Sequence, residues 1–128
     1  LKGEGTEPQA VATVQEMEMQ EQVVFVSFVP DRLRTVRRSD PSLAVAPIFA
    51  HPPKDAARRA AEIDASGVRI LYRDLTWGLV EQAHELGLEV GAWSPNEEAE
   101  WRAMTALGVD VICTDFPDRL TAMLGRDV

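Results

Sequence analysis

The sequence lacks the features that mark secreted and membrane-spanning proteins. Its 128 residues include a single cysteine, Cys113, so no disulfide bond can form within the chain. One unpaired cysteine is typical of a reducing compartment, and we expect a cytoplasmic protein. The sequence contains no run of about 18 apolar residues, so we expect no transmembrane helix.

Basic residues and nucleotide-binding motifs are also scarce. The chain has 13 Lys and Arg against 21 Asp and Glu, a net charge of −8 with neutral histidines. Such a chain repels the phosphates of nucleic acids, so we expect no nucleic-acid partner. Neither GxGxxG nor GxxxxGK[ST] occurs, which argues against a nucleotide bound at a glycine-rich turn. A hydrophobic content of 45% is nevertheless typical of a packed domain.

What the sequence does contain is a regular succession of short apolar segments. Five of them have the composition of β-strands, at residues 23–28, 43–49, 67–72, 88–93 and 109–114. Their starts lie roughly 20 to 25 residues apart, a spacing too long for hairpins and suited to strand–helix–strand crossovers. Pro47 has no N–H group to donate, which indicates a strand end or bulge at that position.

Helix signals fill the intervals between these strands. Pro8 and Pro30 lie where helices would begin, and Asn96 is a favourable N-cap. The predicted helices cover residues 7–17, 30–39, 54–66, 79–86 and 97–107. Alternating strands and helices predict an α/β fold with a parallel sheet.

Two architectures share this pattern, an open doubly wound sheet and a (β/α)₈ barrel. A barrel needs about 250 residues, so a chain of this length supplies about half of one. A small, independent sheet domain is the alternative, and strand order distinguishes the two.

Four stretches resemble the glycerophosphodiester phosphodiesterase family, whose fold is a TIM barrel related to the phosphatidylinositol phospholipases C. Leu1-Lys2 is similar to the end of the family's Glu-x-Lys strand, and residues 23–28 to its strand ending in Ser-Phe. Residues 87–96, GLEVGAWSPN, are similar to a helix, glycine and strand ending in Trp-Thr-Val-Asn. Residues 108–117, GVDVICTDFP, are similar to the closing Gly-Val-Asp-Gly-Ile-x-Thr-Asp-Tyr-Pro.

The resemblance implies that residues 1–128 are the C-terminal portion of a TIM (β/α)₈ barrel of the phospholipase C-like phosphodiesterase type. The domain would be partial, with its N-terminal half absent. The chain starts at Leu1 without a methionine, in keeping with a cut at this point. Because the resemblance places three family strands upstream, we interpret residues 68–72 as a short extra element or loop strand.

The same resemblance implies an activity in lipid metabolism. Family members hydrolyse glycerophosphodiesters to glycerol 3-phosphate and an alcohol, with a divalent cation, Mg²⁺ or Ca²⁺. The family's two histidines and two of its acidic ligands belong to His-Arg-Gly, Glu-x-Asp and His-Asp motifs of its N-terminal half, and neither of the two histidine motifs occurs here. The third acidic ligand would directly precede Leu1. We therefore expect the isolated chain to be inactive and to hold no cation.

Three site residues carry over from the family motifs. Lys2 matches the motif lysine and would act in catalysis near the phosphate; alternatively it is a frayed terminal residue. Phe28 and Trp93 lie at strand ends, where barrel active sites open, and would bind substrate. Core packing is the alternative for both. None of the residues carried over is a metal ligand.

Other chemically capable residues have simpler structural interpretations. We expect Asp115 to cap the turn that follows it, His51 to be a solvated loop residue and His84 to lie on a helix surface. Cys113, on an apolar strand, is predicted to be a small core residue. Trp101 is predicted to pack against the sheet.

Two further functions remain open beside the enzyme. A non-catalytic half-barrel would bind a partner or self-associate, because open sheet edges expose unpaired backbone groups. An unrelated small α/β binding domain would instead have a sheet that is complete on its own.

Overall fold

Each strand of the protein is followed by a helix. The computed structural model describes residues 1–126. Its strands are β1 (Val24–Ser27), β2 (Ala44–Phe49), β3 (Gly67–Leu71), β4 (Glu89–Trp93) and β5 (Val111–Cys113). Its α-helices are α1 (Glu7–Glu16), α2 (Pro30–Ser39), α3 (Ala56–Glu62), α4 (Trp77–Glu85), α5 (Glu98–Leu107) and α6 (Pro117–Met123). Two short 3₁₀ turns are η1 (Gln20–Gln22) and η2 (Tyr72–Asp74). Within residues 1–126, no helix combines the length and apolar character that crossing a bilayer requires.

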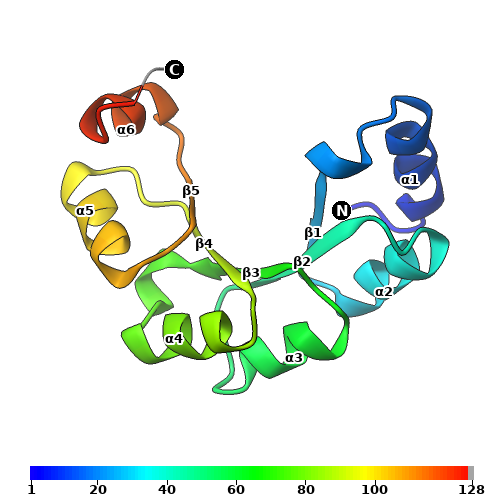
Figure 1. Cartoon of the computed structure of the whole chain (residues 1–128), viewed down its shortest axis with the longest axis horizontal. Helices are drawn as coiled ribbons and strands as arrows, with labels where there is room; N and C mark the ends of the chain where they lie inside the picture. Colours follow the sequence, from blue (N-terminus) through cyan, green and yellow to red (C-terminus); the bar gives the residue numbers. More distant parts are fainter. Residues whose placement is uncertain (127–128) are drawn as a thin grey trace.

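The strands form one parallel sheet in the order β1-β2-β3-β4-β5. The sheet curls into an open arc with the helices along its outer, convex side (Figure 1). A doubly wound sheet reverses its strand order at a switch point and carries helices on both faces, and neither feature is present in residues 1–126. The fold is therefore TIM-barrel-like, and the hypothesis of a small, complete sheet domain is wrong.

The interpretation of residues 68–72 as an extra loop strand is also wrong. β3 lies at the centre of the sheet, with Ile48 of β2 and Gly91 of β4 on either side of its Arg69. Arg69 interrupts the apolar run, which made the strand look weak in sequence. The five predicted strands are all present. Helix α6 was not predicted, because its first residue, Pro117, was interpreted as part of a turn.

The main core lies between the convex face of the sheet and the helices. Side chains alternate across a strand, so Val68 and Ile70 of β3 face the helices. One cluster comprises Ala56, Ala57, Ala60, Val68, Ile70, Leu75, Leu79, Val80, Ala83, Leu88, Val90, Ala92 and Met104. A second comprises Val11, Phe25, Leu33, Val36, Leu43, Val45 and Ile63. Helices pack along the whole arc, which leaves the opposite, concave face for the remaining side chains.

Two glycines on neighbouring strands make room for an arginine on the concave face. A Cβ atom on Gly91 would lie 2.5 Å from the Arg69 Cδ, and one on Gly67 would lie 3.1 Å from an Arg69 guanidinium nitrogen. The Arg69 side chain is only 16% exposed and pairs with Glu89 at 2.9 Å. This ion pair lies toward the amino ends of β3 and β4, the end of the sheet opposite to the one at which barrel active sites open.

Candidate functional site at the carboxyl ends of the strands

Two of the predicted site residues meet above the concave face. Phe28 directly follows β1 and Trp93 ends β4, yet their ring centroids lie 5.9 Å apart in an edge-to-face arrangement with an interplanar angle of 89°. The curl of the sheet brings these distant strands together. Phe28 is 53% exposed, so it is not an ordinary core residue. Both rings lie at the carboxyl ends of parallel strands, the end at which barrel enzymes bind substrates.

The third predicted residue, Lys2, lies beside the free edge of β1. The Leu1 amino group donates a hydrogen bond to the Val26 carbonyl oxygen at 2.6 Å. The buried Ser27 hydroxyl donates to the Leu1 carbonyl oxygen at 3.1 Å and accepts from the Val29 N–H. Residues 1–2 therefore run along β1 near its carboxyl end, and the Lys2 side chain is exposed there.

Asn96 connects the loops that follow β4 and β5. Its amide nitrogen donates to Asp115 Oδ2 at 2.8 Å, and its oxygen accepts from the Thr114 hydroxyl and the Asp115 N–H. The prediction that Asn96 caps α5 is wrong, because Glu97 occupies the N-cap position. Asp115 does not cap its turn either; the Thr114 hydroxyl accepts from the Phe116 N–H instead. These bonds tie together two strand-end loops beside Trp93.

A second constellation at the same end of the sheet was missed in the sequence. The Arg73 Nε donates to the Tyr72 hydroxyl at 3.0 Å, and that hydroxyl donates to Glu100 Oε1 at 2.7 Å. Glu100 Oε2 accepts from the Asn96 and Glu97 N–H groups at 2.9 and 3.2 Å. A hollow of about 440 Å³ lies here, lined by Leu71, Tyr72, Arg73, Trp93, Ser94, Asn96, Glu97 and Glu100.

The hydrogen bonds of this relay favour the charged forms of Glu100 and Arg73. The Tyr72 hydroxyl and the backbone N–H groups hold the pKa of Glu100 below its ordinary value. The bond to the Tyr72 hydroxyl raises the pKa of Arg73. One local signal was available in the sequence, because Glu97 and Glu100 have the spacing of a capping box. Nothing local indicated that Glu100 also accepts a hydrogen bond from Tyr72, which lies in the turn after β3.

The two histidines lie apart from each other. His51 is in a loop, 87% exposed, with Nδ1 3.1 Å from Asp74 Oδ2. His84 lies on the surface of α4, with Nε2 2.8 Å from Asp110 Oδ2, near the amino ends of the strands. Burial raises the pKa of Asp110, but the hydrogen bonds from the Val90 N–H and His84 outweigh it and lower the pKa overall.

A divalent cation needs several oxygen or nitrogen ligands in one place. No three His, Cys, Asp or Glu side chains in residues 1–126 lie together in such a group. The residues that the structure describes therefore do not fit the cation that the family resemblance implies.

The remaining predictions concern packing. Trp101, which was predicted to pack against the sheet, is buried, and its Nε1 donates to the Pro95 carbonyl oxygen at 2.8 Å. The prediction that Cys113 is a core residue is wrong: its side chain is exposed, because β5 is the last strand of the sheet.

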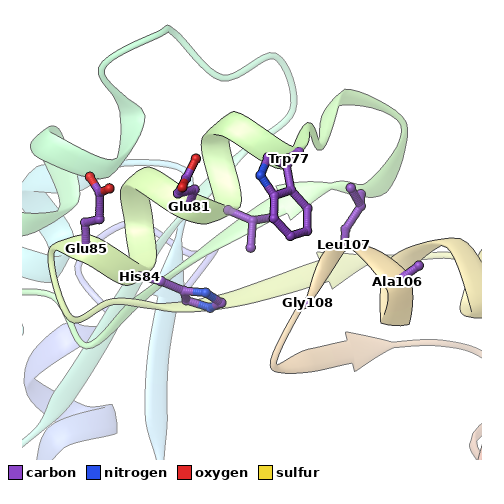
Figure 2. A pocket seen from close by; sticks show the side chains of 8 residues that line it. Trp77, Glu81, His84, Glu85, Ala106, Leu107 and Gly108 are labelled. Carbon is purple, nitrogen blue, oxygen red and sulfur yellow. The ribbon is translucent and has the colours of Figure 1, made fainter.

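A further hollow, of about 490 Å³, lies on the outside of the arc between α4 and α5. In Figure 2 the Trp77 ring of α4 extends toward Leu107 of α5, whereas Glu81 and Glu85 point away from it. This hollow is lined by helix residues and by Gly108, without any residue from a strand end. It is therefore separate from the candidate site.

The chain resembles known proteins in both sequence and fold. Residues 4–119 match the model of the family described as "Glycerophosphoryl diester phosphodiesterase family". The curated glycerophosphodiester phosphodiesterase of Caldanaerobacter subterraneus subsp. tengcongensis is 25% identical over 122 residues, which cover 95% of this chain and 50% of that protein.

Solved structures share the fold. A candidate glycerophosphodiester phosphodiesterase from Galdieria sulphuraria superposes with a TM-score of 0.90 and 30% identity, over 98% of this chain and 53% of that one. An Oleispira antarctica phosphodiesterase, solved with the product sn-glycerol-3-phosphate, has a TM-score of 0.80 and 21% identity, over 96% and 52% of the two chains. The chain thus spans about half the length of these relatives.

Proposed function

Because this chain belongs to the glycerophosphoryl diester phosphodiesterase family, we propose that the enzyme containing it hydrolyses glycerophosphodiesters to glycerol 3-phosphate and an alcohol. In this reaction the oxygen of water bonds to phosphorus, the bond between phosphorus and the alcohol oxygen breaks, and the alcohol leaves with a proton. The observation that carries the proposal is the pairing of Phe28 and Trp93 at the carboxyl ends of β1 and β4.

The roles of the residues within the proposal follow from their positions. The exposed Phe28 ring and the half-buried Trp93 ring form an apolar wall that would bind the carbon skeleton of the substrate. Lys2, on the neighbouring edge, would neutralise phosphate charge in the transition state. The proposal takes residues 1–128 as the C-terminal portion of the barrel and places the proton-transfer groups and the ligands of a divalent cation outside this chain.

The proposal is tested by expressing the open reading frame that encodes this chain, from its first codon to its last. Release of glycerol 3-phosphate from glycerophosphocholine and glycerophosphoinositol is measured in a coupled dehydrogenase assay, with and without a chelator. We expect turnover that the chelator abolishes, and no turnover from residues 1–128 alone. Absence of turnover from the complete product with either substrate, in the presence of Mg²⁺ or Ca²⁺, would contradict the proposal.

A matched pair of tryptophan variants tests the site itself. We expect Trp93→Ala to lower kcat/KM about tenfold or more, because about 1.5 kcal/mol of apolar contact with substrate is lost. Trp77→Ala is the control, because Trp77 is 62% exposed and lies on the convex side of the arc. Equal effects of the two variants would place the substrate elsewhere.

A second function, self-association of a non-catalytic half-barrel, is favoured by one observation. Val24, Phe28 and Val29 are exposed apolar residues in and after β1, which is an edge strand of the described sheet. A second copy of the chain would cover them. Sedimentation velocity of residues 1–128 at several concentrations tests this: a concentration-dependent dimer supports it, and a monomer throughout contradicts it.

A further inference from the structure

In the hollow beside Trp93, the Tyr72 ring and the Glu100 carboxylate already interact with other residues of the chain. The guanidinium carbon of Arg73 lies 5.4 Å from the centroid of the Tyr72 ring, within the range of a cation–π contact. Both Glu100 oxygens accept hydrogen bonds, one from the Tyr72 hydroxyl and the other from two backbone N–H groups. An arginine of the chain thus occupies the place that a cationic ligand would take.

The groups that remain free in the hollow include both hydrogen-bond donors and hydrogen-bond acceptors. The Arg73 Nη1 and Nη2 atoms and the Ser94 hydroxyl make no hydrogen bond to another side chain or backbone group within residues 1–126. The exposed Glu97 carboxylate accepts one N–H group from its own helix and retains further lone pairs. Arg73 is held in position by the relay through Tyr72 to Glu100, so its free edge is preorganised.

We propose that this hollow binds the alcohol part of the diester and that Arg73 makes the enzyme prefer an uncharged, polyhydroxylated alcohol to a quaternary ammonium alcohol. The inference rests on the proposed function and adds a specificity-determining residue to it. Each hydroxyl of a polyol both donates and accepts, so it pairs with the guanidinium edge and with the Glu97 carboxylate.

One physical cause disfavours the quaternary ammonium alcohol, and another favours the polyol. A trimethylammonium group binds best where it meets an aromatic face and a negative charge. In this hollow the Tyr72 face and the Glu100 charge are engaged by Arg73 or its relay, so such a group would have only the Trp93 ring and the Glu97 carboxylate to bind. It would also lie beside a like charge. Trp93 provides an apolar surface for the carbon atoms of the polyol. The same Trp93 ring lines the hollow and contacts the Phe28 ring.

The test compares two diesters that share the glycerol 3-phosphate part. Values of kcat/KM for glycerophosphoinositol and glycerophosphocholine are measured with the complete product of the open reading frame, and their ratio reports the preference. We expect a ratio above about 10 in the wild type, and a ratio about tenfold lower in Arg73→Gln, mainly because the choline diester is used better.

Three further variants separate the causes. Arg73→Lys keeps the charge but loses the Nε–H group that donates to the Tyr72 hydroxyl, and Tyr72→Phe keeps the ring but loses the hydroxyl that accepts from the guanidinium. Both variants should give intermediate ratios. Arg102→Gln is the matched control, because Arg102 is an exposed cation on α5 that pairs with Glu98 and does not line the hollow. Its ratio should equal that of the wild type.

The outcomes distinguish the two proposals. Hydrolysis of both diesters with a ratio near one in the wild type, or a ratio that Arg73→Gln leaves unchanged, would overturn the inference and leave the proposed function intact. An equal fall in the ratio for Arg102→Gln would also overturn it, because the effect would then be one of net charge. Hydrolysis of neither diester would overturn both proposals.

Discussion

Adding one methyl group to each of three glycines tests how the concave face is packed. Gly91 and Gly67 lie on β4 and β3 against Arg69, whereas Gly78 lies in α4. A Cβ atom on Gly91 would meet the Arg69 Cδ at 2.5 Å, and one on Gly67 would meet the Glu89 carbonyl oxygen at 2.5 Å. Around Gly78 no atom lies within 4 Å of the added Cβ. The added methyl group thus meets a side chain at Gly91 and a backbone atom at Gly67, whereas at Gly78 it meets no obstacle.

The expected costs follow from what must move. In Gly91→Ala the Arg69 side chain swings away and gives up its pairing with Glu89, at a cost of about 1–2 kcal/mol. In Gly67→Ala the obstacle is backbone within the sheet, so we expect a loss of about 3 kcal/mol. Gly78→Ala should stabilise the protein by about 0.5–1 kcal/mol, because alanine is the better helix former and meets no obstacle.

Equilibrium unfolding in urea, followed by circular dichroism, measures all three variants on the same scale. A double-mutant cycle assigns the cause: with Arg69→Ala already present, Gly91→Ala should cost about 1 kcal/mol less than in the wild type. A Gly91→Ala variant as stable as the wild type would refute the reasoning. So would an unchanged cost in the absence of the Arg69 side chain.

Three other predictions follow from the same structure. Trp101→Phe should destabilise the protein by about 1–3 kcal/mol in urea unfolding, because the Pro95 carbonyl oxygen loses its buried donor; the control Trp77→Phe should not. Asp110, with its pKa lowered by folding, stabilises the protein fully above its usual value of 3.8 and loses that contribution as the pH falls through the folded-state value. Asp110→Asn should therefore flatten the acid side of a plot of thermal midpoint against pH, and an unchanged slope would contradict this. The exposed Cys113 thiol should react with a disulfide reagent without denaturant in residues 1–128 and more slowly in the complete product of the open reading frame; equal rates would mean that β5 stays uncovered there.

The strands and helices were largely predictable, because their signals are local. Apolar runs bounded by glycine or proline indicated all five strands, and their spacing indicated parallel pairing. The status of β3 was not predictable in this way, because Arg69 looks out of place in a strand until Gly91 is seen beside it. Whether an arginine is compatible with a central strand depends on the residue paired with it on the neighbouring strand, and the local sequence pattern does not contain that information.

In the candidate site, too, individual residues were predictable from the sequence but their contacts were not. Phe28 and Trp93 were found through family motifs, but their contact depends on the curl of the sheet. Tyr72 opens the turn η2 directly after β3, and Glu100 lies in α5 as one half of a capping box, so each has an ordinary local role. Only the folded chain brings the tyrosine hydroxyl to the carboxylate. Sequence patterns therefore indicate which strand, helix or loop carries a residue, and packing determines which side chains come into contact.

The number of strands in the sheet constrains where the rest of the proposed active site would lie. Five strands are present, and residues 1–2 run along β1 as a sixth position. An eight-stranded barrel then has room for two more strands, not the three that the family resemblance implied. Those two would join β5 to the segment at Lys2. Under the proposed function they must carry the proton-transfer groups, which places them beside Lys2 on one side and the loop of Asp115 on the other. The hollow at Arg73 adjoins the loop of Asp115 through Asn96, which lines the hollow and donates to Asp115 Oδ2 at 2.8 Å.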